Sequence, residues 1–397
     1  VSYEPGDKVY YVNRGKSLNA TTFGKKPLDQ GLRINGAHID SPRLDLKPNP
    51  LYEDSEISYL KTHYYGGIRK YQWPTIPLAL HGTIALADGS SVDICIGEDE
   101  GDPVLVISDL LPHLGAEQGK KPLDHAFDGE TLNAIACSSP YMFDGKPADV
   151  SDAVKLNLMR LLNEKYCITE PDFMSADLCL VPAGRAVDIG VDRWLMGGYG
   201  HDDKVCAYPS LTALLEADGS EHTLMCVLAD KEETGSDGVT GMQCSLLTEL
   251  IDAVCEQLGG SGKVCRSNSM CLSADVSACY DPSFADVFEK RNSALCNCGV
   301  VMNKYNGARG KSSTSEATAE FIAKLRRMFD SEGVLWQTAE PGRVDAGGSG
   351  TVARFIANHN IDTIDLGVPV LSMHAPFEAI SKADLYSAHK AMLAFYR

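Results

Sequence analysis

Short apolar runs alternate along the chain with longer segments in which apolar residues recur at helical spacing. The short runs predict buried strands at 32–40, 223–230, 269–276 and 362–370. The longer segments predict amphipathic helices at 208–217, 245–258, 315–329 and 382–396. Strands that alternate with helices are typical of a mostly parallel sheet covered by helices on both faces. We therefore expect an α/β fold.

The chain has a different pattern from about residue 77 to about residue 188. Its apolar runs are shorter and more β-like there, and Gly and Pro interrupt them. These runs are 81–97, 102–114 and 177–190. The pattern predicts a β-rich domain inserted into the α/β domain. The expected division is a catalytic domain in two parts, 1–77 and 192–397, around an insertion at 78–191.

Composition limits the partners that we expect. The chain has 397 residues and a formal net charge of -18, whereas nucleic acids and anionic membrane surfaces require a basic face. No apolar run approaches the ~18 residues that a membrane-spanning helix requires. The 13 cysteines are scattered through apolar stretches, which predicts buried thiols in a reducing cytoplasm and no disulfide framework.

Two adjacent glutamates, Glu232 and Glu233, directly follow the predicted strand 223–230. In open α/β sheets the carboxyl ends of the strands form the ligand-binding edge. The pair is therefore either an ordinary solvated turn or a combination of one metal ligand and one general base.

Further candidate ligands follow other predicted strands. His38 ends one strand, and Asp40 two residues later points to the same side in an extended chain. A carboxylate commonly holds the second ring nitrogen of a metal-bound His, which is the role expected of Asp40. The alternative for His38 is a surface His beside a turn. Asp275 ends another apolar run, and His374 follows the run at 362–370, although a lone His there is more often structural.

Asp202 and Asp203 precede the helix predicted at 208–217. Asp is favoured as a helix cap, and the alternative is that one Asp bridges two metal ions while the other orients it. Taken together, two His and three carboxylates from separate segments could hold two ions of the Zn²⁺ class at one sheet edge, with one carboxylate left as a base.

Several motifs resemble the aspartyl aminopeptidase family, metallopeptidase family eighteen, and its bacterial branch in particular. They occur in the family's order and are GAHIDSPRLDLK, HDDKVCAYPSL, DKEETGSDG, SADVSACYDP, DAGGSGT and LSMHAPFE. The resemblance implies a cytosolic dizinc exopeptidase that removes the amino-terminal residue from peptides. It also implies that the inserted β-rich domain mediates dimerisation, and that the dimers assemble into a tetrahedral dodecamer.

The resemblance assigns a role to each site residue. One metal ion would be bound by His38, Asp202 and Asp275, and the other by Asp202, Glu233 and His374. Glu232 would be the general base, and Asp40 would complete the catalytic group. Zn²⁺, Co²⁺ and Mn²⁺ all accept such nitrogen and oxygen ligands.

Three further residues, Lys304, Glu117 and Gly348, are candidates for binding substrate. In eukaryotic members a His four residues after the His of a P-H-L motif reaches the pocket of a neighbouring subunit, and Glu117 stands at that place here. A carboxylate there disfavours the amino-terminal Asp or Glu that the family prefers, and Lys304 could supply compensating positive charge. The alternative functions are another dizinc hydrolase, such as a deacetylase or carboxypeptidase, and a catalytically silent scaffold.

Overall fold

The computed structural model describes residues 3–348 and 350–397, and the chain forms two compact units. The first unit comprises Val1–Ser41, Val187–Met373 and Glu378–Arg397, and the second comprises Pro42–Ala186 and His374–Phe377. None of the helices in the described parts of the chain has the length and apolar character needed to cross a membrane.

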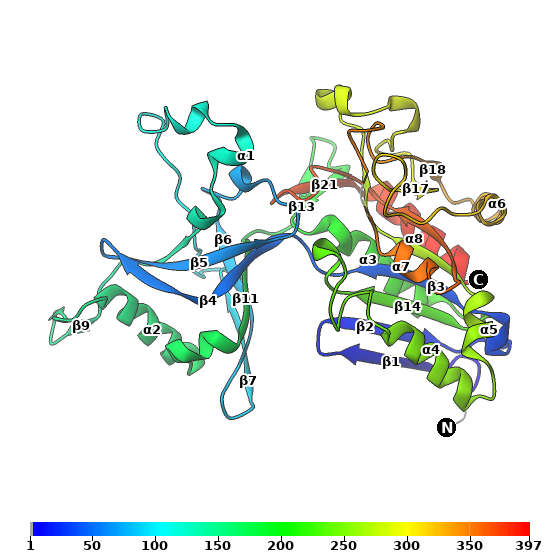
Figure 1. Ribbon diagram of the computed structural model, residues 1–397, viewed down its shortest axis with the longest axis horizontal. Coiled ribbons are helices and arrows are strands. Elements are labelled where there is room, and N and C mark those ends of the chain that lie inside the picture. Colours follow the sequence, from blue (N-terminus) through cyan, green and yellow to red (C-terminus); the bar gives the residue numbers. More distant parts are fainter. Residues whose placement is uncertain (1–2, 349) are drawn as a thin grey trace. The chain divides into compact units, whose positions relative to one another are not determined.

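An eight-stranded sheet lies at the centre of the first unit (Figure 1), in the order β1-β2-β14-β3-β15-β19-β17-β18. In this order the strands are Lys8–Asn13, Ser17–Thr22, Leu224–Ala229, Arg33–His38, Met270–Ala274, Asp362–Gly367, Val300–Asn303 and Trp336–Thr338. The central strands β14, β3, β15 and β19 run parallel, whereas β1, β2 and β17 pair antiparallel with their neighbours towards the centre. The four predicted strands therefore form the parallel centre of a mixed sheet.

Helices cover both faces of this sheet. They are α3 His201–Glu216, α4 Leu246–Gln257, α5 Gly262–Ser267, α6 Ala319–Ser331, α7 Ala353–Ala357 and α8 Lys382–Tyr396. Leu224 and Cys226 of β14 belong to the apolar cluster that includes α3, α6 and α8, whereas Met225 and Val227 belong to the cluster of α4, α5 and α7. This alternation follows from the two-residue period of a strand. The four predicted helices are confirmed, and Figure 1 shows α3 and α8 on the opposite side of the strands from α4 and α5.

A smaller sheet in the first unit has the order β12-β13-β21-β20-β16. Its strands are Val187–Ile189, Leu195–Gly198, Glu378–Ser381, Pro369–Leu371 and Ser277–Ala278. Strands β20 and β21 pair antiparallel, so the segment His374–Phe377 lies on the hairpin loop that joins them.

The second unit is built on a six-stranded antiparallel sheet with the order β7-β6-β11-β4-β5-β8. In this order its strands are Ser91–Ile96, Leu78–Ala85, Ala176–Pro182, Arg43–Asp54, Ile57–Tyr65 and Ala134–Cys137. The unit also contains the short strands β9 Met142–Phe143 and β10 Lys146–Pro147, and the helices α1 Leu123–Ala126 and α2 Ala153–Tyr166.

The second unit differs from the predicted insertion in three respects. Its main segment runs from Pro42 to Ala186, whereas the predicted insertion spans 78–191. The segment starts earlier than predicted because β4 pairs with β11 and β5 pairs with β8 in one sheet. The run 102–114 forms only isolated bridges at Leu105 and Val106. The 14-residue helix α2 was not expected within a β-rich segment.

Close packing at Gly367, the last residue of β19, positions the end of β15. A Cβ atom added at Gly367 would lie 1.6 Å from the carbonyl oxygen of Asp275, far inside the contact distance of two non-bonded atoms. Because β15 and β19 are hydrogen-bonded neighbours, only a glycine allows the two backbone segments to approach so closely at this point.

We expect Gly367→Ala to lower the free energy of unfolding by about 1–3 kcal/mol, the usual effect of overpacking. Urea denaturation of the full chain measures the change. Gly310→Ala is the matched control, since its added Cβ would meet no atom within 4 Å, and we expect it to stay within about 0.5 kcal/mol of the parent. Equal free energies for the two variants would contradict the close approach.

Candidate metal centre

His38 lies at the centre of a group of acidic side chains in the first unit. It is the last residue of β3 and is 1% exposed. Its Nε2 lies 3.1 Å from Oδ1 of Asp202 and 3.7 Å from Oδ1 of Asp275. Asp202 is in the first turn of α3 and Asp275 directly follows β15. Residues far apart in the sequence thus meet where parallel strands end.

Asp40 connects His38 to the paired glutamates. Nδ1 of His38 lies 3.0 Å from the carbonyl oxygen of Asp40 and 3.3 Å from its Oδ1. The two carboxylate oxygens of Asp40 accept hydrogen bonds from the backbone amides of Glu232 and Glu233, each at 3.1 Å. A single carboxylate therefore contacts the imidazole ring and holds the turn that carries both glutamates.

The glutamates lie on a short 3₁₀ turn, η6 Glu232–Thr234, just after β14. Lys231 before it and Gly235 after it both have positive φ values, 70° and 99°, and glycine adopts this conformation without steric cost. Both glutamates are only partly exposed, unlike residues of an ordinary solvated turn. One potential ligand atom from each of His38, Glu232 and Glu233 lies within 4.8 Å of the others.

Asp202 and Asp203 are buried at the start of α3, where their backbone angles are not helical and a cis peptide bond joins them. The amide of Asp202 donates a hydrogen bond to Oε2 of Glu378 at 3.1 Å. Oδ2 of Asp203 accepts a hydrogen bond from the amide of His38 at 3.3 Å. With His38 and Asp275, the two residues form a second group whose potential ligand atoms all lie within 4.8 Å.

The crowded acids raise one another's pKa. Burial, followed by repulsion from Asp275, raises the pKa of Glu232 to about 9. Burial, followed by Asp275 and Asp202, raises the pKa of the Asp203 carboxyl well above its usual value. Burial alone would lower the pKa of His38, but hydrogen bonds to Asp202 and Asp275 outweigh it and raise that pKa. A divalent cation would offset this repulsion, so the donor set fits a metal ion.

His374 belongs to the second unit by its contacts. Its Nδ1 lies 3.0 Å from the carbonyl oxygen of Gly67, and a Cβ at Gly67 would lie 3.2 Å from that nitrogen. His374 has a positive φ of 66°, which suits its place on the loop between β20 and β21.

The contacts of the three candidate substrate-binding residues are with residues outside the His38 group. Nζ of Lys304 lies 3.2 Å from Oε1 of Glu316. The side chain of Glu117 is 84% exposed in the second unit, 2.6 Å from Nζ of Lys120. Gly348 lies against the backbone of Ala308, and an added Cβ would come within 2.5 Å of its Cα. These contacts give none of the three residues a defined role in the His38 group.

Two buried acids, Glu378 and Asp365, were not predicted from the sequence as part of a site. Glu378 holds the amide of Asp202, and Oδ1 of Asp365 accepts a hydrogen bond from the hydroxyl of Thr351 at 2.6 Å. Burial raises the pKa of Asp365 to about 7. The available signal was an acidic residue next to apolar residues in a short strand, because a carboxylate is rarely buried there without a specific partner.

Comparison with known proteins identifies the family. The family described as "Aminopeptidase I zinc metalloprotease (M18)" matches residues 1–396. The chain belongs to this M18 family. An M18 family aminopeptidase 1 from Clostridium acetobutylicum is 50% identical over 394 residues, covering 98% of this chain and 84% of the relative. Its counterpart from Thermotoga maritima is 44% identical over 388 residues, covering 96% of this chain and 84% of the relative.

Solved structures of M18 proteins share the fold. The crystal structure of aminopeptidase I from C. acetobutylicum matches with a TM-score of 0.95 and 49% identity, covering 99% of this chain and 85% of that chain. The T. maritima M18 structure also has a TM-score of 0.95, with 43% identity and coverage of 100% and 88%. The predicted family is confirmed, and the M18 protein is a zinc metalloaminopeptidase that hydrolyses peptide bonds.

Asp40→Asn in the M18 enzyme should lower metal affinity or kcat/KM by about 10- to 100-fold, as is typical when a residue that supports a metal ligand is changed. The neutral amide cannot accept hydrogen bonds from both glutamate amides. Metal content after dialysis and peptide hydrolysis measure the two effects. Asp252→Asn, at an exposed position of α4, is the control and should leave both unchanged. Parent-like values for Asp40→Asn would show that Asp40 does not support the site.

Proposed function

We propose that this M18 aminopeptidase acts through two divalent metal ions and a glutamate general base. One ion has His38, Asp202 and Asp275 as ligands, and the other has Asp202, Glu233 and His374. The observation that carries the proposal is the meeting of His38 with Asp202 and Asp275 at distances of 3.1 and 3.7 Å. Imidazole and carboxylate ligands suit Zn²⁺, and Co²⁺ or Mn²⁺ accept them as well.

The hairpin between β20 and β21 supports the assignment of His374. Glu378 is the first residue after the segment His374–Phe377, and its carboxylate accepts the hydrogen bond from the amide of Asp202. The residue that begins β21 is thus hydrogen-bonded to the Asp proposed to bridge the two ions.

The proposed reaction divides the work between the two glutamates. A Zn²⁺ ion held by these residues would supply a nucleophile, because it would lower the pKa of a water molecule to ~7. Glu232 would accept a proton from the attacking water and then donate it to the leaving amine of the cleaved peptide. Glu233 serves as a ligand. Asp40 keeps the two glutamates in a fixed relation through their backbone amides.

We further propose that the second unit mediates dimerisation and that the dimers build a tetrahedral dodecamer. Its sheet ends in the edge strands β7 and β8, and exposed edges favour pairing with another chain. Large apolar residues are also exposed in this unit, among them Phe143, Leu156 and Leu161. The mApe1 protein of S. cerevisiae, which shares the fold with a TM-score of 0.77 and 20% identity, is described as a dodecamer.

We also propose which residues contact the substrate and in which compartment the protein acts. Lys304, Glu117 and Gly348 stay candidates for substrate binding, and a carboxylate at Glu117 would disfavour an acidic first residue. The cysteines of the described chain are free thiols, which supports a reducing cytoplasm. The names of the relatives favour an aminopeptidase over the deacetylase and carboxypeptidase alternatives.

Glu232→Gln should reduce kcat by at least ~100-fold, the usual minimum for loss of a general base. The amide keeps the size of the side chain but cannot accept the proton. Metal content and melting temperature should stay near those of the parent. Glu256→Gln, at an exposed position of α4, is the control and should keep full activity.

Glu233→Gln should behave differently, because a ligand is lost. We expect weaker binding of one metal ion and partial recovery of activity in excess metal. If Glu232→Gln loses metal while Glu233→Gln retains it, the two roles are reversed. If neither variant changes the rate, the pair is only part of a turn.

We expect the intact chain to sediment as a dodecamer and to dissociate to dimers when the protein is diluted. Sedimentation velocity over a dilution series gives the masses directly. A monomer throughout the series would contradict the proposal without affecting the assignment of the catalytic residues.

A further inference from the structure

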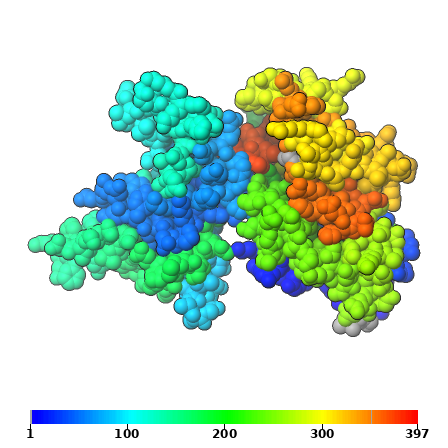
Figure 2. Space-filling model, viewed as in Figure 1, coloured from blue at the N-terminus to red at the C-terminus, as the bar shows by residue number. Residues whose placement is uncertain are grey.

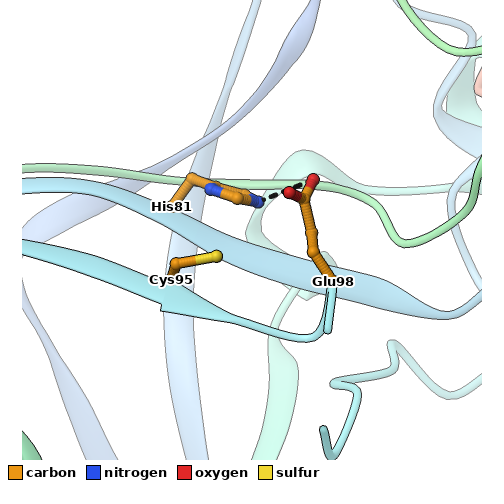
Figure 3. Close-up of side chains that lie close together, drawn as sticks. All are labelled: His81, Cys95 and Glu98. Atoms are coloured by element: carbon orange, nitrogen blue, oxygen red, sulfur yellow. Dashed lines mark ion pairs between the residues drawn. The ribbon is translucent and has the colours of Figure 1, made fainter. Parts of the chain in front are cut away.

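A second group of side chains with metal-binding chemistry lies in the second unit, on its six-stranded sheet. His81 of β6 and Cys95 of β7 are directly opposite each other in the strand register, so their side chains point to the same face of the sheet. Glu98 follows β7 after a turn, and its Oε1 lies 3.0 Å from Nε2 of His81. Figure 3 shows the ring of His81 and the sulfur of Cys95 directed towards the carboxylate of Glu98.

This face of the sheet is polar, in contrast to the opposite face. Thr83 of β6 donates a hydrogen bond to Asp93 of β7 at 2.6 Å on the same side as His81 and Cys95. Leu80 and Ile94, which alternate with these residues along the strands, are buried. Figure 1 shows that the β6–β7 hairpin projects from the sheet, and Figure 2 shows its light-blue tip at the molecular surface. Cys95 is exposed and the side chain of Glu98 is 51% exposed, so an ion in solution has a path to the group.

The donor atoms of the three residues lie close enough to share one ion. One potential ligand atom from each of His81, Cys95 and Glu98 lies within 4.8 Å of the others. Zinc bonds of about 2.0–2.3 Å to such atoms place tetrahedral ligands roughly 3.3–3.8 Å apart. Rotation of the exposed Cys95 and Glu98 side chains can therefore complete the geometry without movement of the strands.

The imidazole nitrogen that faces Glu98 is not satisfied by a hydrogen bond. Nε2 of His81 is shielded from solvent and makes no hydrogen bond within the described residues, and its 3.0 Å contact with Glu98 is an ion pair only when the ring is protonated. Shielded polar atoms normally have a partner. A cation held between His81, Cys95 and Glu98 would supply that partner.

The turn after β7 brings Glu98 and further negative charge to the group. Gly97 has a positive φ of 108°, and its amide donates a hydrogen bond to Oδ2 of Asp102 at 3.0 Å. Asp99 and Asp102 follow Glu98 in the sequence, so this turn carries several negative charges. Such charges attract a divalent cation.

We propose that His81, Cys95 and Glu98 form a binding site for a transition-metal ion of the Zn²⁺ class, separate from the catalytic ions. Imidazole, thiolate and carboxylate are all zinc ligands, and three protein ligands leave a fourth position for water. A thiolate selects against Mg²⁺ and Ca²⁺, which prefer oxygen. On binding, a metal–sulfur bond forms and the Cys95 thiol releases its proton to solvent. The ion would join two neighbouring strands and the loop that follows them.

Co²⁺ is the probe that separates this site from the catalytic one. A thiolate bound to Co²⁺ gives a charge-transfer absorption in the near ultraviolet, whereas the imidazole and carboxylate ligands of the proposed catalytic centre do not. We expect titration of the metal-stripped full chain with Co²⁺ to produce this absorption, with a final intensity that corresponds to one thiolate-bound ion per subunit beside the ions taken up by the catalytic centre. Excess Zn²⁺ should abolish it by competition.

Matched cysteine variants assign the absorption to its source. Cys95→Ser should abolish it, whereas Cys167→Ser, at another exposed cysteine of the same unit, should leave it unchanged. His81→Gln should weaken Co²⁺ binding at least tenfold. Circular dichroism confirms that each variant is folded, and peptide hydrolysis in all three should stay close to the parent. Absence of the absorption in the parent chain, or its persistence in Cys95→Ser, would overturn the proposal and leave His81 and Glu98 as a simple ion pair.

Discussion

Electrostatic repulsion among buried carboxylates is the constraint on which the first unit depends. Asp202, Asp203 and Asp275 surround His38, and Glu232 lies close enough for Asp275 to raise its pKa. Bringing such charges out of water is costly unless an opposite charge compensates them. A protonated imidazole offsets part of this charge, and a divalent cation offsets far more. The site is therefore built to receive cations, and the surrounding fold must hold the acids together until they arrive.

The parallel centre of the sheet provides that support. β14, β3 and β15 are adjacent, and their carboxyl ends carry the glutamate pair, His38 and Asp275. Each strand is apolar on both sides because helices cover both faces. A displacement of one acid would therefore disturb a packed layer, and this rigidity opposes the repulsion between the side chains.

The sequence allowed these central elements to be predicted because their signal is local. An apolar run that ends in His38 or in Glu232 and Glu233 shows both a buried strand and the polar group at its end. The membership of β4 and β5 in the second unit was not predictable in this way, because it depends on pairing with β11 and β8. Glu378 and Asp365 were missed for a related reason. Each is an acid beside apolar residues in a short strand, and only the folded chain shows that each has a neighbouring backbone or hydroxyl partner.

The hydrogen bonds of Asp40 have a consequence for the order in which the proposed centre fills. Its carboxylate contacts the ring of His38, which would serve one ion, and fixes the amide of Glu233, which would serve the other. The first ion to bind would therefore reduce the motion of ligands of the second, so less conformational entropy would be lost when the second ion enters. Such a centre would take up two ions cooperatively, and its half-loaded form would be a minor species.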